Sequence, residues 1–170
     1  QSALMQAMMM LAKNTIKVDG GSASMIVNGT YIPGSSASKV VSVDVSWGSM
    51  TFTYNASSEG RWDDKTHTYV EQSTPSWEFD TDANKVTVTN HSNTVIEAQL
   101  SFTKASGTNI VGAFTDSVGA TGDGKMTIAS AVGTNVNQAP SAYAHFNITS
   151  GDITSNGKIG SITLKIVSVS

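Results

Sequence analysis

The stretch KVTVTNHSNTVIEAQLSFT, residues 85–103, decides which fold class this sequence predicts. Apolar side chains recur at every second position in both of its halves, first at Val86 and Val88 and then at Ile96, Ala98, Leu100 and Phe102. A period of two is the signature of a half-buried β-strand. The four residues between the halves, NHSN at 90–93, are of types that favour turns. We therefore expect a β-hairpin here.

The same alternation continues along the chain from about residue 22 onwards. In VVSVDVSWGSMTFTY, residues 40–54, two alternating runs flank Gly48 and Ser49. This pattern fits either two strands joined by a tight turn or one long strand with a glycine bulge. Further strands are expected at residues 108–114, 124–130, 141–149 and 158–170.

Short strands separated by turn residues, without a helical pattern between them, predict an antiparallel sandwich rather than βαβ units. We expect an all-β protein, an antiparallel immunoglobulin-like or jelly-roll β-sandwich of about 8–10 strands. Its 170 residues are enough for one core. The predicted organisation is an apolar N-terminal extension at residues 1–18 and a single sandwich domain at residues 19–170.

The composition excludes several classes of function. Charged residues make up 14% of the chain, the net charge is -3, and lysines and arginines do not cluster. Neither nucleic-acid binding nor attraction to a membrane surface through basic residues is therefore expected. The sequence has no apolar window of about 18 residues, so no membrane span is expected. It has no cysteine, which removes disulfides and thiol chemistry.

The first residues, QSALMQAMMMLAKN, are unusually apolar for such a polar chain. We expect Gln1 to be the start of a processed mature chain. Strong helix formers dominate the run, so it favours a short helix locally, although this run or TIKV at 15–18 could also act as a donor strand. Methionine adapts to irregular surfaces, which favours a contact with a neighbouring subunit, and packing on the chain's own sandwich is the alternative. The predicted subunit-contact residues are Leu4, Met5, Met8, Met9, Met10, Leu11, Ile16 and Val18.

No catalytic constellation is recognisable. His67, His91 and His145 are scattered, and no serine lies in a GxSxG motif, so we expect no catalytic residues and no enzyme.

One segment has the beginning of a calcium-loop pattern. Asp80, Asp82 and Asn84 have its spacing, but Lys85 stands where glycine is required and His91 where glutamate is required. We interpret this segment as a turn, with calcium as the alternative and no other cofactor.

Aromatic and acidic residues gather between residues 62 and 80. Flat rings stack on the CH groups of sugars and carboxylates bind their hydroxyls, so this region could form a carbohydrate- or ligand-binding face. The residues concerned are Trp62, Asp63, Asp64, Tyr69 and Trp77. We give more weight to the other interpretation, in which both tryptophans pack inside the sandwich and the acids are solvated.

Four stretches, VNGTY, VVSVDVSWGSMTFTY, GRWDDKTHTYV and NKVTVTNHSNTVIEAQLSF, resemble small, mostly uncharacterised exported proteins of Gram-positive gut bacteria. The similarity covers roughly residues 25–169. The hairpin stretch is also similar in style to matrix-fibre proteins of the TasA/camelysin type. The resemblance implies an extracellular immunoglobulin-like sandwich that starts with a short V-x-G-x-Y strand, and it assigns no activity. The matching positions are Val27, Gly29, Tyr31, Trp47, Met50, Phe52, Tyr54, Trp62, Thr66, His67, Tyr69 and 87–93.

Two functions of different classes follow. The first is a secreted, bacterial cell-surface structural subunit that self-assembles with copies of itself into a fibre, pilus-like filament or surface layer through its N-terminal segment. The second is an extracellular carbohydrate- or ligand-binding module that uses residues 62–80. An origin in a phage or virion surface is left open.

Overall fold

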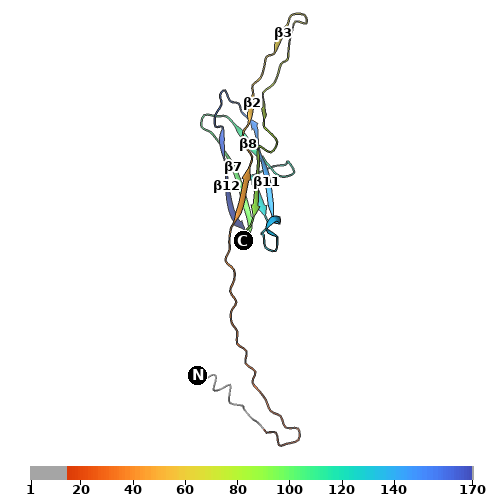
Figure 1. Ribbon diagram of the computed structural model, residues 1–170, viewed down its shortest axis with the longest axis vertical. Coiled ribbons are helices and arrows are strands. Elements are labelled where there is room, and N and C mark those ends of the chain that lie inside the picture. The colour runs from red at the N-terminus through yellow and green to blue at the C-terminus, as the bar shows by residue number, and fades with distance from the viewer. Residues whose placement is uncertain (1–14, 170) are drawn as a thin grey trace. The chain divides into compact units, whose positions relative to one another are not determined.

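The computed structural model describes residues 15–169 (Figure 1). The chain divides into two units, Gln1–Ala37 and Ser38–Ser170. In the first unit, the described residues 15–37 form no strand. The V-x-G-x-Y strand implied by the resemblance at residues 27–31 is therefore not formed there.

The second unit contains the strands and one short 3₁₀ turn, η1 (Val136–Gln138). A five-stranded sheet has the order β1-β6-β11-β8-β9, a three-stranded sheet has the order β10-β7-β12, and every pair is antiparallel. The predicted all-β antiparallel sandwich of about 8–10 strands is confirmed. The strands of these two sheets are β1 (Val43–Trp47), β6 (Lys85–Asn90), β7 (Val95–Lys104), β8 (Val111–Thr115), β9 (Thr121–Gly122), β10 (Lys125–Ile128), β11 (Ser141–Ser150) and β12 (Gly160–Val169).

The core lies between the two sheets and consists of the inward side of the alternating pattern. Phe146 of β11 is at its centre, with its ring centroid 4.7 Å from that of Phe102 and 5.5 Å from that of Phe114. Such aromatic pairs stabilise a core beyond the apolar area that they bury. The buried cluster comprises Val86, Val88, Ile96, Ala98, Leu100, Phe114, Met126, Ile128, Ala144 and Phe146.

The predicted hairpin at residues 85–103 is wrong in its pairing, although both strands are present. β6 belongs to the five-stranded sheet and β7 to the three-stranded sheet, so residues 91–94 form an arch that crosses the sandwich. Asn90 explains this path. Its side chain is fully buried and donates to the carbonyl oxygens of Thr94 (3.0 Å), Ile128 (3.3 Å) and Ala129 (2.8 Å), while its Oδ1 accepts from the Ser92 N–H.

Around Gly48 the structure forms neither one continuous strand nor a tight-turn hairpin, because β1 ends at Trp47 and β2 (Thr53–Asn55) begins in another sheet, with residues 48–52 between them. After β1, the Gly48 N–H still donates to Lys85 O (3.0 Å), and the Met50 N–H donates to Ala83 O (2.9 Å). Met50 has a φ of 51°, which displaces the chain. A Cβ at Gly48 would lie 2.3 Å from the Asp82 oxygen, so only glycine fits.

A long hairpin projects beyond the two sheets at the end away from the C-terminus (Figure 1). It is built from β2 (Thr53–Asn55) paired with β5 (Ser76–Glu78), and from β3 (Arg61–Asp63) paired with β4 (Thr68–Val70). A single bridge between Ser58 and Ser73 connects the two short ladders. The hairpin thus carries the aromatic region at residues 62–80.

Candidate functional site

The sandwich is open along one side, where each sheet ends in an edge strand. β12 pairs with β7 along all of its ten residues, and among the described residues no strand pairs with its other edge. β1 likewise pairs only with β6. An unpaired edge leaves the outward-pointing N–H and C=O groups of alternate residues free to bind another strand.

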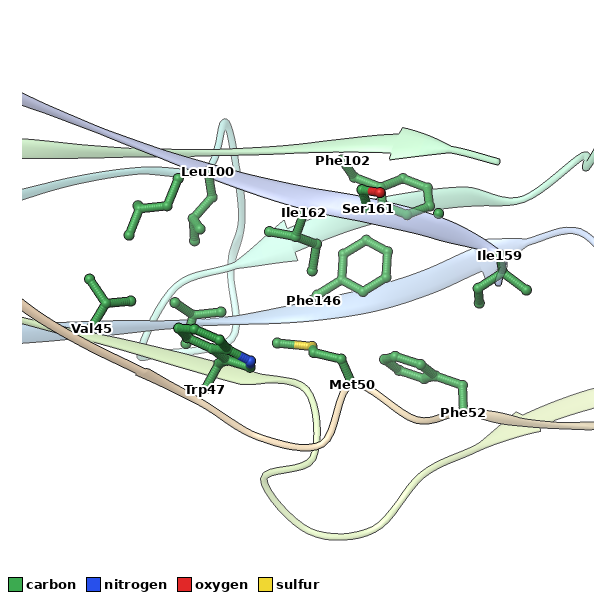
Figure 2. Close-up of a pocket in the computed structure, with 13 residues that line it drawn as sticks. Val45, Trp47, Met50, Phe52, Leu100, Phe102, Phe146, Ile159, Ser161 and Ile162 are labelled. Carbon is green, nitrogen blue, oxygen red and sulfur yellow. The ribbon is translucent and has the colours of Figure 1, made fainter. Parts of the chain in front are cut away.

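An apolar groove of about 520 Å³ lies at this open side. Figure 2 shows Trp47, Met50 and Phe52 on one wall, with Phe146 between them and the Phe102 and Ile162 side chains opposite. The floor is the core itself, because Leu100 and Phe146 are only 4% and 2% exposed. The lining residues are Val45, Trp47, Met50, Phe52, Val86, Leu100, Phe102, Phe146, Ile159, Gly160, Ser161, Ile162 and Leu164.

The chemistry of the groove suits an apolar chain. None of its lining residues is charged, and Ser161, which alternates with the core-facing Ile162 of β12, is the only one with a side-chain hydroxyl. Trp47 is 68% exposed, which is unusual for the largest apolar side chain. With no titratable side chain, the lining offers shape and apolar contact and no acid or base that could activate a nucleophile.

Sequence reasoning did not find this groove. The alternating runs on either side of Gly48 place Val45 with Trp47, and Met50 with Phe52, on one face of each run, and the structure directs Val45, Met50 and Phe52 against the core. The sequence feature that could have indicated the groove is the presence of a tryptophan, a methionine and a phenylalanine within six residues.

The structure brings two of the predicted ligand-binding residues together on the projecting hairpin. Trp62 pairs with Tyr69 across β3 and β4, their ring centroids are 5.3 Å apart, and they are 51% and 57% exposed. The His67 ring stacks on Trp62 at 6.2 Å with an interplanar angle of 5°. We call Trp62, His67 and Tyr69 the aromatic cluster. The interpretation that Trp62 packs inside the sandwich is wrong, because a two-stranded hairpin has no second layer to cover it.

The other residues of that set lie differently. Trp77 is half-buried in β5, where its Nε1–H donates to Gly151 O (2.9 Å) and its ring lies 5.0 Å from that of Tyr54. Asp63 accepts from the Lys65 N–H (2.8 Å) and so holds the hairpin turn, and Asp64 is exposed in the same turn.

The segment with calcium-loop spacing is a turn in this structure. Ala83 N–H donates to Asp80 O (3.0 Å), and the Lys85 N–H donates to Asp82 O (3.2 Å). Asn84 is buried, and its amide donates to Phe146 O (2.8 Å), which ties the turn to β11. Within residues 15–169 no three His, Cys, Asp or Glu side chains form a group that could hold a metal ion.

Two histidines contact acids at the sandwich surface. His91 lies 3.1 Å from Asp44, and His145 lies 3.5 Å from Asp82. Each histidine therefore has one acidic neighbour.

The predicted subunit-contact residues fall into two groups. Ile16 and Val18 are 54% and 73% exposed. The others, Leu4, Met5, Met8, Met9, Met10 and Leu11, lie outside the described residues.

No protein-family model, curated protein or solved structure matches this chain. The part of the chain that the structure describes contains no helix with the length and apolarity needed to cross a membrane. The groove and the aromatic cluster are therefore interpreted from their own geometry.

Proposed function

We propose that this protein is a non-enzymatic structural subunit of an extracellular or cell-surface assembly, such as a fibre, pilus-like filament or surface layer. In this assembly, part of the N-terminal unit of one copy fills the groove of a neighbour. The observation that supports the proposal is the uncharged apolar groove beside the edge of β12 with which no strand of residues 15–169 pairs. An extended segment added to such an edge gains main-chain hydrogen bonds, and the groove accepts its alternate side chains.

The energetic argument rests on what the open groove leaves exposed. Trp47 is mostly exposed, and burial of one large apolar side chain contributes about 1.5–3 kcal/mol. A strand that covers Trp47, Met50 and Phe52 would gain several such contributions. The same strand would pair the free N–H and C=O groups of β12 at a net gain of roughly 1 kcal/mol per hydrogen bond.

The geometry of such a contact favours a filament. A segment from one copy and a groove on the next are different surfaces, so the contact is head-to-tail. A contact of that kind extends into an open chain unless its rotation closes a ring.

The experiment compares two exposed tryptophans, one in the groove and one outside it. We expect Trp47→Ser to raise the concentration needed for assembly at least tenfold in analytical ultracentrifugation and electron microscopy, because the groove loses the large exposed apolar side chain that docking would bury. Trp62→Ser is the matched control, since Trp62 is comparably exposed but lies on the hairpin. A wild-type chain that stays monomeric at millimolar concentration, or a Trp47→Ser variant that assembles normally, would overturn the proposal.

A second candidate function is binding of carbohydrate or another ligand by the exposed aromatic cluster. Its support is that Trp62 and Tyr69 present solvent-facing rings on a projecting hairpin. This candidate predicts that soluble glycans shift the NMR signals of these rings and that Trp62→Ser abolishes the shift. The NMR signals of Trp77 serve as the control and should not shift, because its ring is half-buried and its Nε1–H already donates to Gly151 O.

A further inference from the structure

The stretch SMIVNGTYI, residues 24–32, is an unpaired strand sequence. It is rich in residues that favour strands, yet residues 22–37 form no strand, and within residues 15–37 their backbones make no hydrogen bond. Its five large apolar side chains are more than four-fifths exposed: Met25, Ile26, Val27, Tyr31 and Ile32.

We propose that residues 24–32 of one copy are the segment that fills the groove of a second copy, lying antiparallel to its β12 with Met25, Val27 and Tyr31 inward. This inference rests on the proposed function and names the segment, its direction and its inward face.

The two faces of the segment differ in the way that the groove requires. Alternation places Met25, Val27, Gly29 and Tyr31 on one face, whereas the other face has Asn28 and Thr30 at its centre. The first face carries no polar group apart from the terminal tyrosine hydroxyl. Residues 20–38 contain no charged side chain, and neither does the groove lining, so docking buries no unpaired charge.

The length of the segment also fits. Nine strand residues span about 30 Å, close to the roughly 33 Å of the ten-residue β12. Pro33 ends the segment, because proline has no N–H to donate to a ladder. By contrast, TIKV at residues 15–18 spans only about 13 Å and carries Lys17.

The area that would be buried is sufficient for a stable contact. The Tyr31 ring would bury roughly 150 Å² or more, and together with Met25, Val27 and the strand backbone it would cover a similar area of groove and β12 edge. The sum over both partners is about 1,000–1,500 Å², which reaches the lower part of the range of specific protein interfaces.

Chain connectivity favours a second copy as the source of the segment. β1 begins where β12 ends, because Val43 pairs with Asn90 and Val169 pairs with Val95, and these two partners flank the arch at residues 91–94. Just before β1, the Val40 N–H donates to Asn93 Oδ1 (2.8 Å), which fixes the chain at this end of the sandwich.

A segment that ran antiparallel to its own β12 would finish at the far end, about 30 Å away. The linker between residue 32 and Val40 spans eight Cα steps and reaches at most about 29 Å when fully stretched. Antiparallel docking in the chain's own groove would therefore need a fully stretched linker, and parallel docking would depart from the antiparallel pairing of every strand in these sheets.

Engineered disulfides test this arrangement, and they are unambiguous because the chain has no cysteine. A Thr30→Cys chain is mixed with chains that carry cysteine at one position on the outward side of β12. If the partner segment is antiparallel, Thr30→Cys should form disulfide-linked dimers with Thr163→Cys or its same-face neighbours Ser161→Cys and Lys165→Cys. An intrachain disulfide in a Thr30→Cys/Val167→Cys double variant, without the mixed dimers, would show parallel docking within one chain and overturn the inference.

A second pair of variants separates this inference from the proposed function. Val27→Asp places a charge on the inward face, and Asn28→Asp places the same charge on the outward face. We expect Val27→Asp to raise the assembly concentration at least tenfold and Asn28→Asp to change it less than threefold. If Trp47→Ser blocks assembly but Val27→Asp does not, the groove is used by another segment and only this inference fails. If neither variant has an effect, the proposed function fails as well.

Discussion

Asn90 provides the sharpest test of how the fold is held together. Its side chain is 0% exposed and makes four hydrogen bonds, three as donor to carbonyl oxygens of Thr94, Ile128 and Ala129 and one as acceptor from Ser92. These bonds connect the end of β6 to the arch and to the end of β10. Asn90→Ala leaves several buried backbone groups without this partner, at about 1–3 kcal/mol for each group that stays unsatisfied. Because some of them will find water, we expect a total loss of about 3–5 kcal/mol, a large part of the usual stability of a domain.

Urea denaturation followed by tryptophan fluorescence measures this loss. Asn93→Ala is the matched control, because Asn93 lies in the same arch and bonds Val40 and Ser38 but is exposed, so we expect a loss below about 1 kcal/mol. Asn90→Asp keeps the shape and the acceptor but cannot donate, so it should destabilise at least as much as Asn90→Ala. Near-equal losses for Asn90→Ala and Asn93→Ala, or a wild-type stability for Asn90→Asp, would refute the argument.

Three further outcomes are expected from the same denaturation assay. Gly48→Ala should destabilise the fold by about 1–3 kcal/mol, because the added Cβ would lie 2.3 Å from the main-chain oxygen of Asp82. Gly122→Ala is the control, because no atom lies within 4 Å of its added Cβ, and it should change stability by less than about 0.5 kcal/mol. Equal effects of the two variants would contradict the close approach at Gly48. Trp77→Phe should cost about 1 kcal/mol because Gly151 O loses its donor, and no measurable loss would mean that water replaces it. Trp62→Ala should leave the midpoint within about 0.5 kcal/mol of wild type, and a larger loss would show that the hairpin supports the sandwich.

The alternating pattern predicted which side of each strand is buried but could not predict which sheet the strand joins. Val86 and Val88 face the core from one sheet, and Ile96 and Ala98 face it from the other. A hairpin folded over a core and an arch that crosses it place the same positions inward, so a period of two cannot distinguish them. The distinguishing signal was Asn90, which shares the inward register of the two valines although it is polar. A polar side chain at that position needs several buried partners, and here the arch and β10 supply them.

The apolar groove was harder to predict, because the sequence of a strand does not show whether another strand covers it. Met50 and Phe52 follow the pattern of half-buried strand residues whether or not another strand covers them. The aromatic cluster was easier, since Trp62 and Tyr69 are close in sequence and pair directly. Trp77 belonged to the same sequence cluster, but the pairing of β5 with β2 places it on a separate ladder from them.

The four edge strands of the two sheets differ in a way that bears on assembly. β9 and β10 have only two and four residues, and such short edges present few free N–H and C=O groups to another strand. β1 has five residues, with Asp44 near His91 on its outer surface. β12 has ten residues, and Lys165 is its one charged side chain. Natural sheets protect such long edges with charges, prolines or bulges when no strand is meant to pair there. The longest and least protected edge is also the one beside the apolar groove, which is the combination that a docking site for another strand requires.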